Sequence, residues 1–254
     1  MKSFTAAAAL AFVSSAAART FTVYNNCPFT IWPAHFTAPA FSSTRPNYPT
    51  GWAQGAYQAV SFSVPDNWTA GRIWARRNCD FSVNPGPNSC LDGGCNGGLE
   101  CDINTGGGVP PATLAEFTLG ASDGNDWYDV SLVDGYNLPV RISNNKGCHV
   151  ADCAVDLGPN CPAQLKGPFD STGFPVGCKS ACEAGLGDPV NNPNCCTGTH
   201  NTAATCPSSG VAYYSYFKSN CPNSYAYAFD ESSGTALWTC SAGQRPDYTV
   251  TFCP

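Results

Sequence analysis

The chain has 254 residues, only 12% of them are charged, and its formal net charge is −6. An acidic chain with so few basic residues lacks the positive surface that nucleic acids require, and anionic lipid does not attract it. Beyond the first eighteen residues, no stretch is long and apolar enough to cross a bilayer as a helix. These features argue against nucleic acid as a partner and predict no membrane span.

The first eighteen residues have the layout of a cleaved secretory signal. Lys2 precedes an apolar run over residues 6–13, and three small residues follow shortly after. We expect residues 1–18 to be removed and residues 19–254 to be secreted, to the extracellular space or the cell wall. The sequon Asn67-Trp68-Thr69 predicts a glycan on Asn67 in that compartment.

Hydrophobic residues alternate with polar ones along much of the chain, with the period of two that is typical of strands with one buried face. The expected inward-facing residues are Phe21 and Val23; Val60, Phe62 and Val64; Ala115, Phe117 and Leu119; Tyr128, Val130 and Leu132; Leu138, Val140 and Ile142; and Tyr248, Val250 and Phe252. Turn residues separate these segments. The pattern predicts a mainly β protein, a flattened antiparallel β-sandwich or barrel of about ten short strands.

Two cysteine-rich segments interrupt this pattern. Residues 79–101 hold four cysteines among Gly and Pro, which predicts a small stapled loop lobe. Residues 148–221 hold nine cysteines and show little apolar periodicity, so this region needs crosslinks to fold. Within it, residues 178–187 are predicted as a short helix with two cysteines at i and i+4. The expected division is a core sandwich (19–78, 102–154 and 222–254), a small lobe (79–101) and an inserted disulfide-rich lobe (155–221).

All sixteen cysteines lie in the mature chain. In an oxidising compartment an even number with varied spacing indicates structural disulfides. Metal ligation is the competing interpretation, and it is disfavoured because His35, His149 and His200 are scattered singly. We therefore expect eight disulfides, no metal and no cofactor, although spacing alone leaves the pairing open.

Carboxylates on two neighbouring strands are the candidates for chemistry. Glu116 and Asp129 alternate with inward-facing residues, so both point outward, Asp129 beside Trp127. Asp134 follows at an Asp-Gly turn, at the rim of the same face. Acids on a strand are often only its solvated side. Acids beside an outward tryptophan nevertheless have the composition of a carbohydrate cleft, where rings stack on sugars and paired carboxylates do acid-base work.

The usual catalytic motifs, such as G-x-S-x-G, H-E-x-x-H and the P-loop, are absent from the sequence. Alternation places Arg72 on one face of its strand together with Trp74 and Arg76.

Several longer motifs carry a family resemblance, among them Gly71-Arg72-Ile73-Trp74 and Trp127-Tyr128-Asp129-Val130. The full set of matching stretches is residues 21–23, 26–32, 71–76, 113–117, 127–139, 153–156, 216–218 and 252–254. On these the chain resembles the thaumatin-like proteins (pathogenesis-related group 5) over essentially its whole mature length, and looks closest to fungal thaumatin-like glucanases. One departure is Asp92-Gly93-Gly94-Cys95, where the family usually has Thr-Gly-Asp before the cysteine.

The resemblance implies a β-sandwich with two lobes and an acidic cleft. It also implies the pairs Cys27–Cys253, Cys79–Cys90, Cys95–Cys101, Cys148–Cys240, Cys153–Cys221, Cys161–Cys178, Cys182–Cys195 and Cys196–Cys206. Family members that act on fungal walls carry one Arg, one Glu and three Asp in the cleft. Here these fall on Arg72, Glu116, Asp129, Asp134 and Asp230.

The first functional hypothesis is a monomeric hydrolase of β-1,3-glucan. In it Glu116 is the general acid and Asp134 activates water, with Asp129 as the alternative, while Arg72, Asp230 and Trp127 bind substrate. The second is a non-catalytic glucan-binding, antifungal or defence-type protein that uses the same cleft. A third is inhibition of a digestive enzyme or permeabilisation of membranes, and the acidic balance of the chain argues against an electrostatic attack on membranes.

Overall fold

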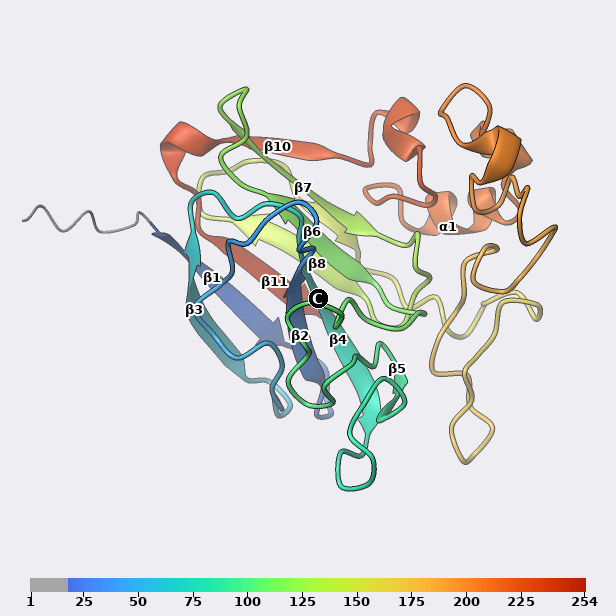
Figure 1. Ribbon diagram of the computed structural model, residues 1–254, viewed down its shortest axis with the longest axis horizontal. Coiled ribbons are helices and arrows are strands. Elements are labelled where there is room, and N and C mark those ends of the chain that lie inside the picture. Colours follow the sequence, from blue (N-terminus) through green and yellow to red (C-terminus); the bar gives the residue numbers. More distant parts are fainter. Residues whose placement is uncertain (1–17) are drawn as a thin grey trace, which may run out of the picture.

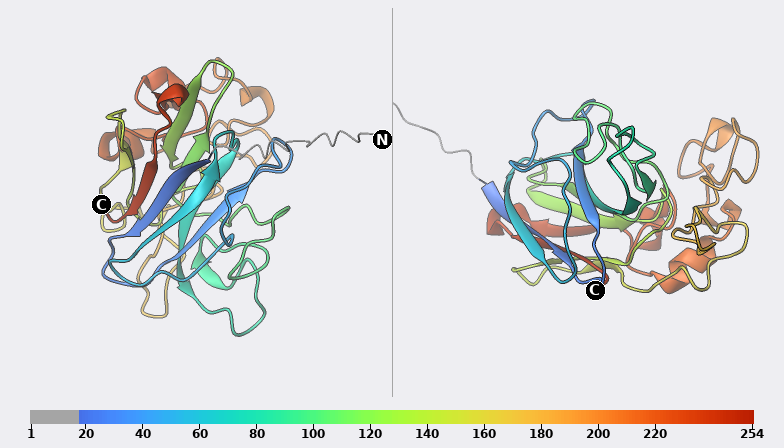
Figure 2. Two further views of the ribbon diagram at one scale, coloured as in Figure 1. Left: turned by 90° about the vertical axis from the view of Figure 1, so that its left-hand side faces the viewer. Right: turned by 90° about the horizontal axis from the view of Figure 1, so that it is seen from below.

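The computed structural model describes residues 18–254 (Figure 1). Residues 1–17, which make up nearly all of the predicted signal, lie outside the described residues. Two β-sheets pack face to face, and a lobe rich in loops lies at one end of them (Figures 1 and 2).

Eleven strands are described. One sheet has the order β3-β1-β11-β8-β9, with β1 Ala18–Asn25, β3 Ala59–Pro65, β8 Val140–Asn144, β9 Ala151–Cys153 and β11 Tyr248–Phe252. The other has the order β10-β7-β6-β4-β2, with β2 Trp32–Thr37, β4 Gly71–Cys79, β6 Leu114–Thr118, β7 Asn125–Ser131 and β10 Trp238–Ser241, and β5 Cys90–Asp92 pairs with β4. The helices are α1 Tyr214–Asn220 and four short 3-10 turns, η1 Gly198–His200, η2 Ser208–Gly210, η3 Asp230–Ser233 and η4 Ala242–Gln244.

The predicted mainly β sandwich is confirmed. The residues expected to face inward are buried between the two sheets, except Val60, which is half-buried. One pair of strands departs from the antiparallel expectation, because β1 runs parallel to β11 with Phe21 opposite Tyr248. Alternation fixes which face a residue occupies but does not reveal the direction of its neighbour, so the sequence could not show this.

The eight disulfides of the structure are the eight pairs that the resemblance implies. Cys27–Cys253 joins the two ends of the described chain, and Cys153–Cys221 joins β9 to the residue that follows α1. Crosslinks of this kind stabilise a loop-rich region mainly by restricting the unfolded chain. The residue limits proposed for the two lobes stay a prediction.

The predicted helix over residues 178–187 is wrong. Residues 181–185 form a turn, with an i to i+4 bond from the Ala184 N–H to the Ser180 carbonyl. Gly185 adopts a left-handed φ of 69°, which prevents the turn from continuing as a helix. The α-helix among the described residues is α1 instead, and it lacks a hydrophobic stripe because it buries only Phe217.

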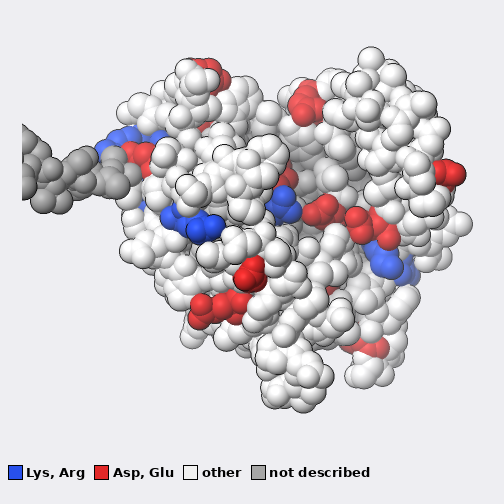
Figure 3. Space-filling view, viewed as in Figure 1, with Lys and Arg blue, Asp and Glu red and all other residues white. Residues whose placement is uncertain are grey.

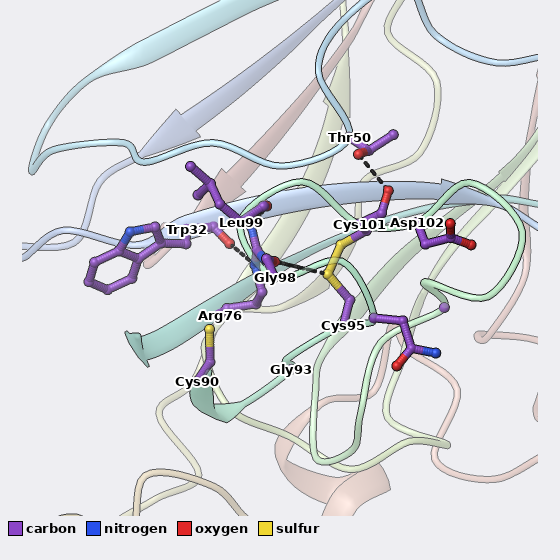
Figure 4. The surroundings of a disulfide bond; sticks show 12 residues. Trp32, Thr50, Arg76, Cys90, Gly93, Cys95, Gly98, Leu99, Cys101 and Asp102 are labelled. Atoms are coloured by element: carbon purple, nitrogen blue, oxygen red, sulfur yellow. Dashed lines mark hydrogen bonds between the residues drawn. A yellow bond between two sulfur atoms is a disulfide. The ribbon is translucent and has the colours of Figure 1, made fainter. Parts of the chain in front are cut away.

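The outer face of β4 is covered along part of its length by the small lobe (Figure 4). Arg76 is fully buried there, and its guanidinium donates to the carbonyls of Trp32, Gly98 and Leu99 at 2.9, 2.6 and 2.8 Å. Burial lowers the pKa of Arg76 to about 10. Trp74 is also buried. Of the three residues expected to share this face, only Arg72 reaches an open surface.

Candidate functional site

An open groove lies over the outer face of the six-stranded sheet. It consists of two adjoining hollows of about 540 and 410 Å³, which share Arg72, Glu116 and Asp129 in their walls. Acidic side chains, with a basic one beside them, gather in the hollow at the middle of the face shown in Figure 3. The groove therefore combines space for a chain-like ligand with a cluster of ionisable groups.

Strand register places three of these groups in one row. Arg72 on β4 lies opposite Glu116 on β6, and Glu116 lies opposite Asp129 on β7. Residues opposite each other in an antiparallel pair have side chains on the same face, with Cβ atoms about 5 Å apart. The sheet thus holds the three ionisable groups side by side on rigid strands.

Arg72 lies between two carboxylates. Its Nε is 3.8 Å from Glu116 Oε1, and its Nη1 is 3.8 Å from Asp134 Oδ2. The side chains of Arg72, Glu116 and Asp134 are 27%, 33% and 35% exposed. All three can therefore touch a ligand in the groove.

Asp134 reaches this place because the chain turns sharply after β7. Its carbonyl accepts the Ala112 N–H at 3.0 Å, and Gly135 follows with a left-handed φ of 80°. A Cβ at position 135 would lie 2.9 Å from Pro111, so both the turn and the close packing require glycine.

Asp129 is more deeply placed than its two neighbours. Only 9% of it is exposed, and its Oδ1 is buried with no hydrogen-bond partner in the described structure. Burial, and then the negative charges of Glu116 and Glu231, raise the pKa of Asp129 well above its usual range. Asp129 therefore keeps its proton to higher pH than an ordinary aspartate does.

The pKa values of the two more exposed acids, Glu116 and Asp134, are also raised. Burial raises the pKa of Glu116, while Arg72 opposes the shift and Asp134 adds to it. Burial likewise raises the pKa of Asp134, again opposed by Arg72. Acids with raised pKa values beside a cation can divide the roles of proton donor and proton acceptor.

Asp230 is placed differently from the other four members of the expected set. It is fully buried, and its Oδ2 accepts the Ala226 N–H at 3.0 Å and pairs with Lys218 Nζ at 2.9 Å. Its Oδ1 accepts the Tyr214 hydroxyl at 2.8 Å. Both oxygens are thus engaged within the protein, so Asp230 supports the loop that contributes Tyr225 and Ala228 to the groove wall.

Trp127 lines the groove as its outward position suggested. It is half-buried, and its Nε1–H donates to Asp123 Oδ2 at 3.1 Å, which orients the indole. Phe41 lies at the same end and is 78% exposed. Sequence reasoning missed Phe41 because it sits in a Pro- and Ser-containing loop without periodicity.

Two further acids near the groove were not singled out from the sequence. Glu231 is exposed, and its charge contributes to the shift of Asp129. Glu183, in the disulfide-rich segment, has a pKa raised by burial and then by Asp134. The only signal for Glu231 was its position next to Asp230, and Glu183 gave none.

The remaining expected features can be placed briefly. No group of three His, Cys, Asp or Glu side chains within residues 18–254 is arranged to hold a metal ion. No helix in that range has the length and apolar character of a membrane span. Asn67 of the sequon is exposed on the turn after β3.

Comparisons with known proteins agree with this architecture. The chain is 41% identical over 254 residues to thaumatin-like protein 1 of Castanea sativa, covering 97% of this chain and 95% of that one. It is 42% identical over 240 residues to pathogenesis-related protein 5 of Arabidopsis thaliana, covering 92% and 90%.

Among solved structures, a laminaripentaose-producing beta-1,3-glucanase in complex with laminaritetraose is similar, with a TM-score of 0.53 over 93% of this chain and 99% of that one. At 12% sequence identity this likeness is one of fold. The profile of the thaumatin family matches residues 25–254. The chain belongs to the thaumatin family.

Proposed function

We propose that the protein hydrolyses β-1,3-glucan in the groove over β4, β6 and β7. The observation that carries the proposal is the position of Arg72 between Glu116 and Asp134, at 3.8 Å from each carboxylate, in an open groove. Glycoside hydrolysis uses one carboxyl group with a raised pKa as proton donor and a second, ionised one, and two carboxyl groups in contact with one guanidinium can supply this pair.

In the proposed reaction Glu116 is the general acid. Its raised pKa favours the protonated form, and it transfers this proton to the glycosidic oxygen as the bond from that oxygen to C1 breaks. A water molecule then adds to C1 from the opposite side and loses a proton to Asp134. Arg72 holds both carboxylates in position and limits how far their pKa values rise.

The other lining residues suit a neutral sugar chain. Trp127 and Phe41 lie at one end of the groove, where their rings can pack against the apolar faces of glucose units. An uncharged polymer is not repelled by the surrounding acids. The similar fold of a beta-1,3-glucanase bound to laminaritetraose supports the choice of polymer but, at 12% identity, not the roles of single residues.

The family supports a defence-type role for such an activity, because named relatives are pathogenesis-related proteins. We also propose that the mature chain is secreted, acts as a monomer and carries a glycan on exposed Asn67. The density of disulfides supports an oxidising compartment.

Release of reducing ends from soluble β-1,3-glucan tests the proposal. We expect Glu116→Gln to lower the rate by about 10²- to 10⁴-fold, the usual contribution of a general acid, and to leave glucan binding intact. Glu100→Gln is the matched control, since Glu100 is exposed and outside the groove. No release by the wild-type protein, or equal release by Glu116→Gln, would contradict hydrolysis. Binding without release would identify a non-catalytic glucan-binding protein.

A further inference from the structure

A second hollow of about 370 Å³ lies away from the groove and shares no lining residue with it. Strand β4 connects the two. Arg77 is five residues beyond Arg72, about 16 Å along the strand, and alternation points it to the opposite face. The walls include Phe29, Arg77, Tyr136, Asp156, Phe174 and Val176, and we call this hollow the Phe29–Phe174 pocket.

Two exposed phenyl rings line the pocket. Phe29 is 38% exposed and Phe174 is 48% exposed, whereas fourteen other aromatic residues of the described chain are buried. The Arg77 guanidinium lies 5.1 Å from the centre of the Phe29 ring and holds it in place by a cation–π contact. Exposed rings gathered around one concave site are a common mark of ligand binding.

The pocket also offers a donor and an acceptor. Both side-chain hydrogen bonds of Arg77 use Nη1, to the carbonyls of Asn137 at 3.5 Å and Val176 at 3.3 Å. Both hydrogen bonds to Asp156 go to Oδ1, from the Tyr136 hydroxyl at 3.1 Å and the Gly158 N–H at 2.9 Å. Within the described residues, Arg77 Nε and Nη2 and Asp156 Oδ2 are left for a ligand.

Charge selects the class of ligand. The positive charge of Arg77 is accompanied in the wall by the carboxylate of Asp156. An anion would face that carboxylate, and a cation would face the guanidinium. A neutral polyhydroxylated ring fits both, because one hydroxyl accepts from Arg77, another donates to Asp156 and the C–H face packs on phenyl rings.

We propose that the Phe29–Phe174 pocket is a second saccharide-binding site, which holds part of a neutral glucan chain while the groove engages another part. The identity of the polymer rests on the proposed function, but the choice of a neutral saccharide rests on the pocket itself. Two contacts on one polymer raise the effective concentration of substrate at the groove.

The test is an NMR titration of the full mature chain with laminaritetraose, a β-1,3-linked glucose tetramer, in the Glu116→Gln background to prevent turnover. The Trp127 indole N–H reports on the groove, and the backbone amides of Gly158 and Phe174 report on the pocket. We expect both sets of signals to shift, as two separate binding events.

A pair of matched variants completes the experiment. Phe174→Ala should lower about tenfold the affinity for laminaritetraose that the Gly158 signal reports, and it should leave the affinity reported by the Trp127 signal unchanged. Phe169→Ala is the control, since Phe169 is 54% exposed and its backbone pairs with Pro175 beside Phe174, but it does not line the pocket. In the control, both signals should report the same affinities as in the Glu116→Gln protein.

The possible outcomes separate this inference from the proposed function. Shifts at Trp127 alone, or a pocket signal that is indifferent to Phe174→Ala, would overturn the second site and leave the groove proposal intact. Shifts at the pocket alone would uphold the second site and count against the groove as the place where glucan binds.

Discussion

Glu116 and Asp129 face each other as direct partners across the β6–β7 pair, and only one of them is accessible. The Glu116 side chain is 33% exposed, whereas Asp129 as a whole is 9% exposed and its Oδ1 has no partner in the described structure. Burial, and then Glu116 and Glu231, raise the pKa of Asp129. A raised pKa makes Asp129 a weaker candidate for an ionised base at acidic pH, so we propose Asp134, the more exposed acid, as the group that activates water.

The first prediction compares two isosteric changes, Asp129→Asn and Asp134→Asn. Because its raised pKa favours the uncharged form of Asp129, replacing it with the neutral Asn should lower the hydrolysis rate by less than about tenfold. Asp134→Asn removes the proposed base, so it should lower the hydrolysis rate by about 10²- to 10⁴-fold. Rates on soluble β-1,3-glucan at one acidic pH decide between them. The reverse order of effects would assign water activation to Asp129.

A second prediction concerns Arg72. Its charge lowers the pKa of both Glu116 and Asp134, against the effect of burial. In Arg72→Gln both pKa values should rise, so Glu116 stays protonated to higher pH and Asp134 needs higher pH to ionise. The whole pH–rate profile should move upward by about one unit.

The matched control for this change is Arg141→Gln. Arg141 pairs with Asp152 at 3.2 Å and lines neither hollow of the groove. Its profile should coincide with that of the wild-type protein. If Arg72→Gln lowers the maximal rate but leaves the pH optimum unchanged, Arg72 binds sugar but does not tune the pKa values of the two acids.

The stereochemistry of the product gives a third prediction. Direct cross-strand neighbours such as Glu116 and Asp129 suit the separation of about 5 to 5.5 Å that retaining enzymes use. Glu116 and Asp134 instead each lie 3.8 Å from a different nitrogen of one guanidinium, an arrangement compatible with the wider spacing of about 6.5 to 9.5 Å that leaves room for water. We expect inversion, so proton NMR of fresh product should show the α-anomer first. Initial β-anomer would indicate a covalent intermediate.

Much of the fold could be predicted because alternation is local. The inward residues of β6 and β7 identified which side chains face outward, and so predicted that Glu116, Asp129 and Trp127 share one face. The parallel pairing of β1 with β11 depends on contacts between the two ends of the chain, which no local pattern encodes.

The site was less predictable from the sequence than the sheet that carries it. Asp230 has the same residue type as the groove acids, but Lys218 and Tyr214 surround it, and sequence spacing does not reveal burial in a loop. The depth of Asp129 likewise depends on what covers its strand. Cover of this kind comes from distant segments, as with the small lobe over Trp74 and Arg76.

The last prediction concerns stability and Asp92, which begins the segment Asp92-Gly93-Gly94-Cys95. Its Oδ1 accepts the Arg77 N–H at 2.9 Å and the Asn137 side-chain N–H at 3.1 Å, while its Oδ2 is buried without a partner in the described structure. Burial raises the pKa of Asp92 to about 7, although Asn137 and Arg77 oppose the shift. In the unfolded chain the pKa of aspartate is about 3.9.

Because the folded-state pKa is the higher one, folding takes up a proton. The associated stability is fully present below about pH 4 and is lost as pH rises towards 7, by up to about 4 kcal/mol. Asp92→Asn removes this titration, so it should be more stable than the wild-type protein at pH 8 and similar at pH 4. Guanidinium unfolding with intact disulfides at both pH values measures the difference.

Asp102→Asn is the control, because Asp102 is exposed and hydrogen bonds from Asn104 and Thr105 lower its pKa, so it should not produce the same trend. Equal pH dependence in Asp92→Asn and the wild-type protein would show that Asp92 is not the buried acid that titrates.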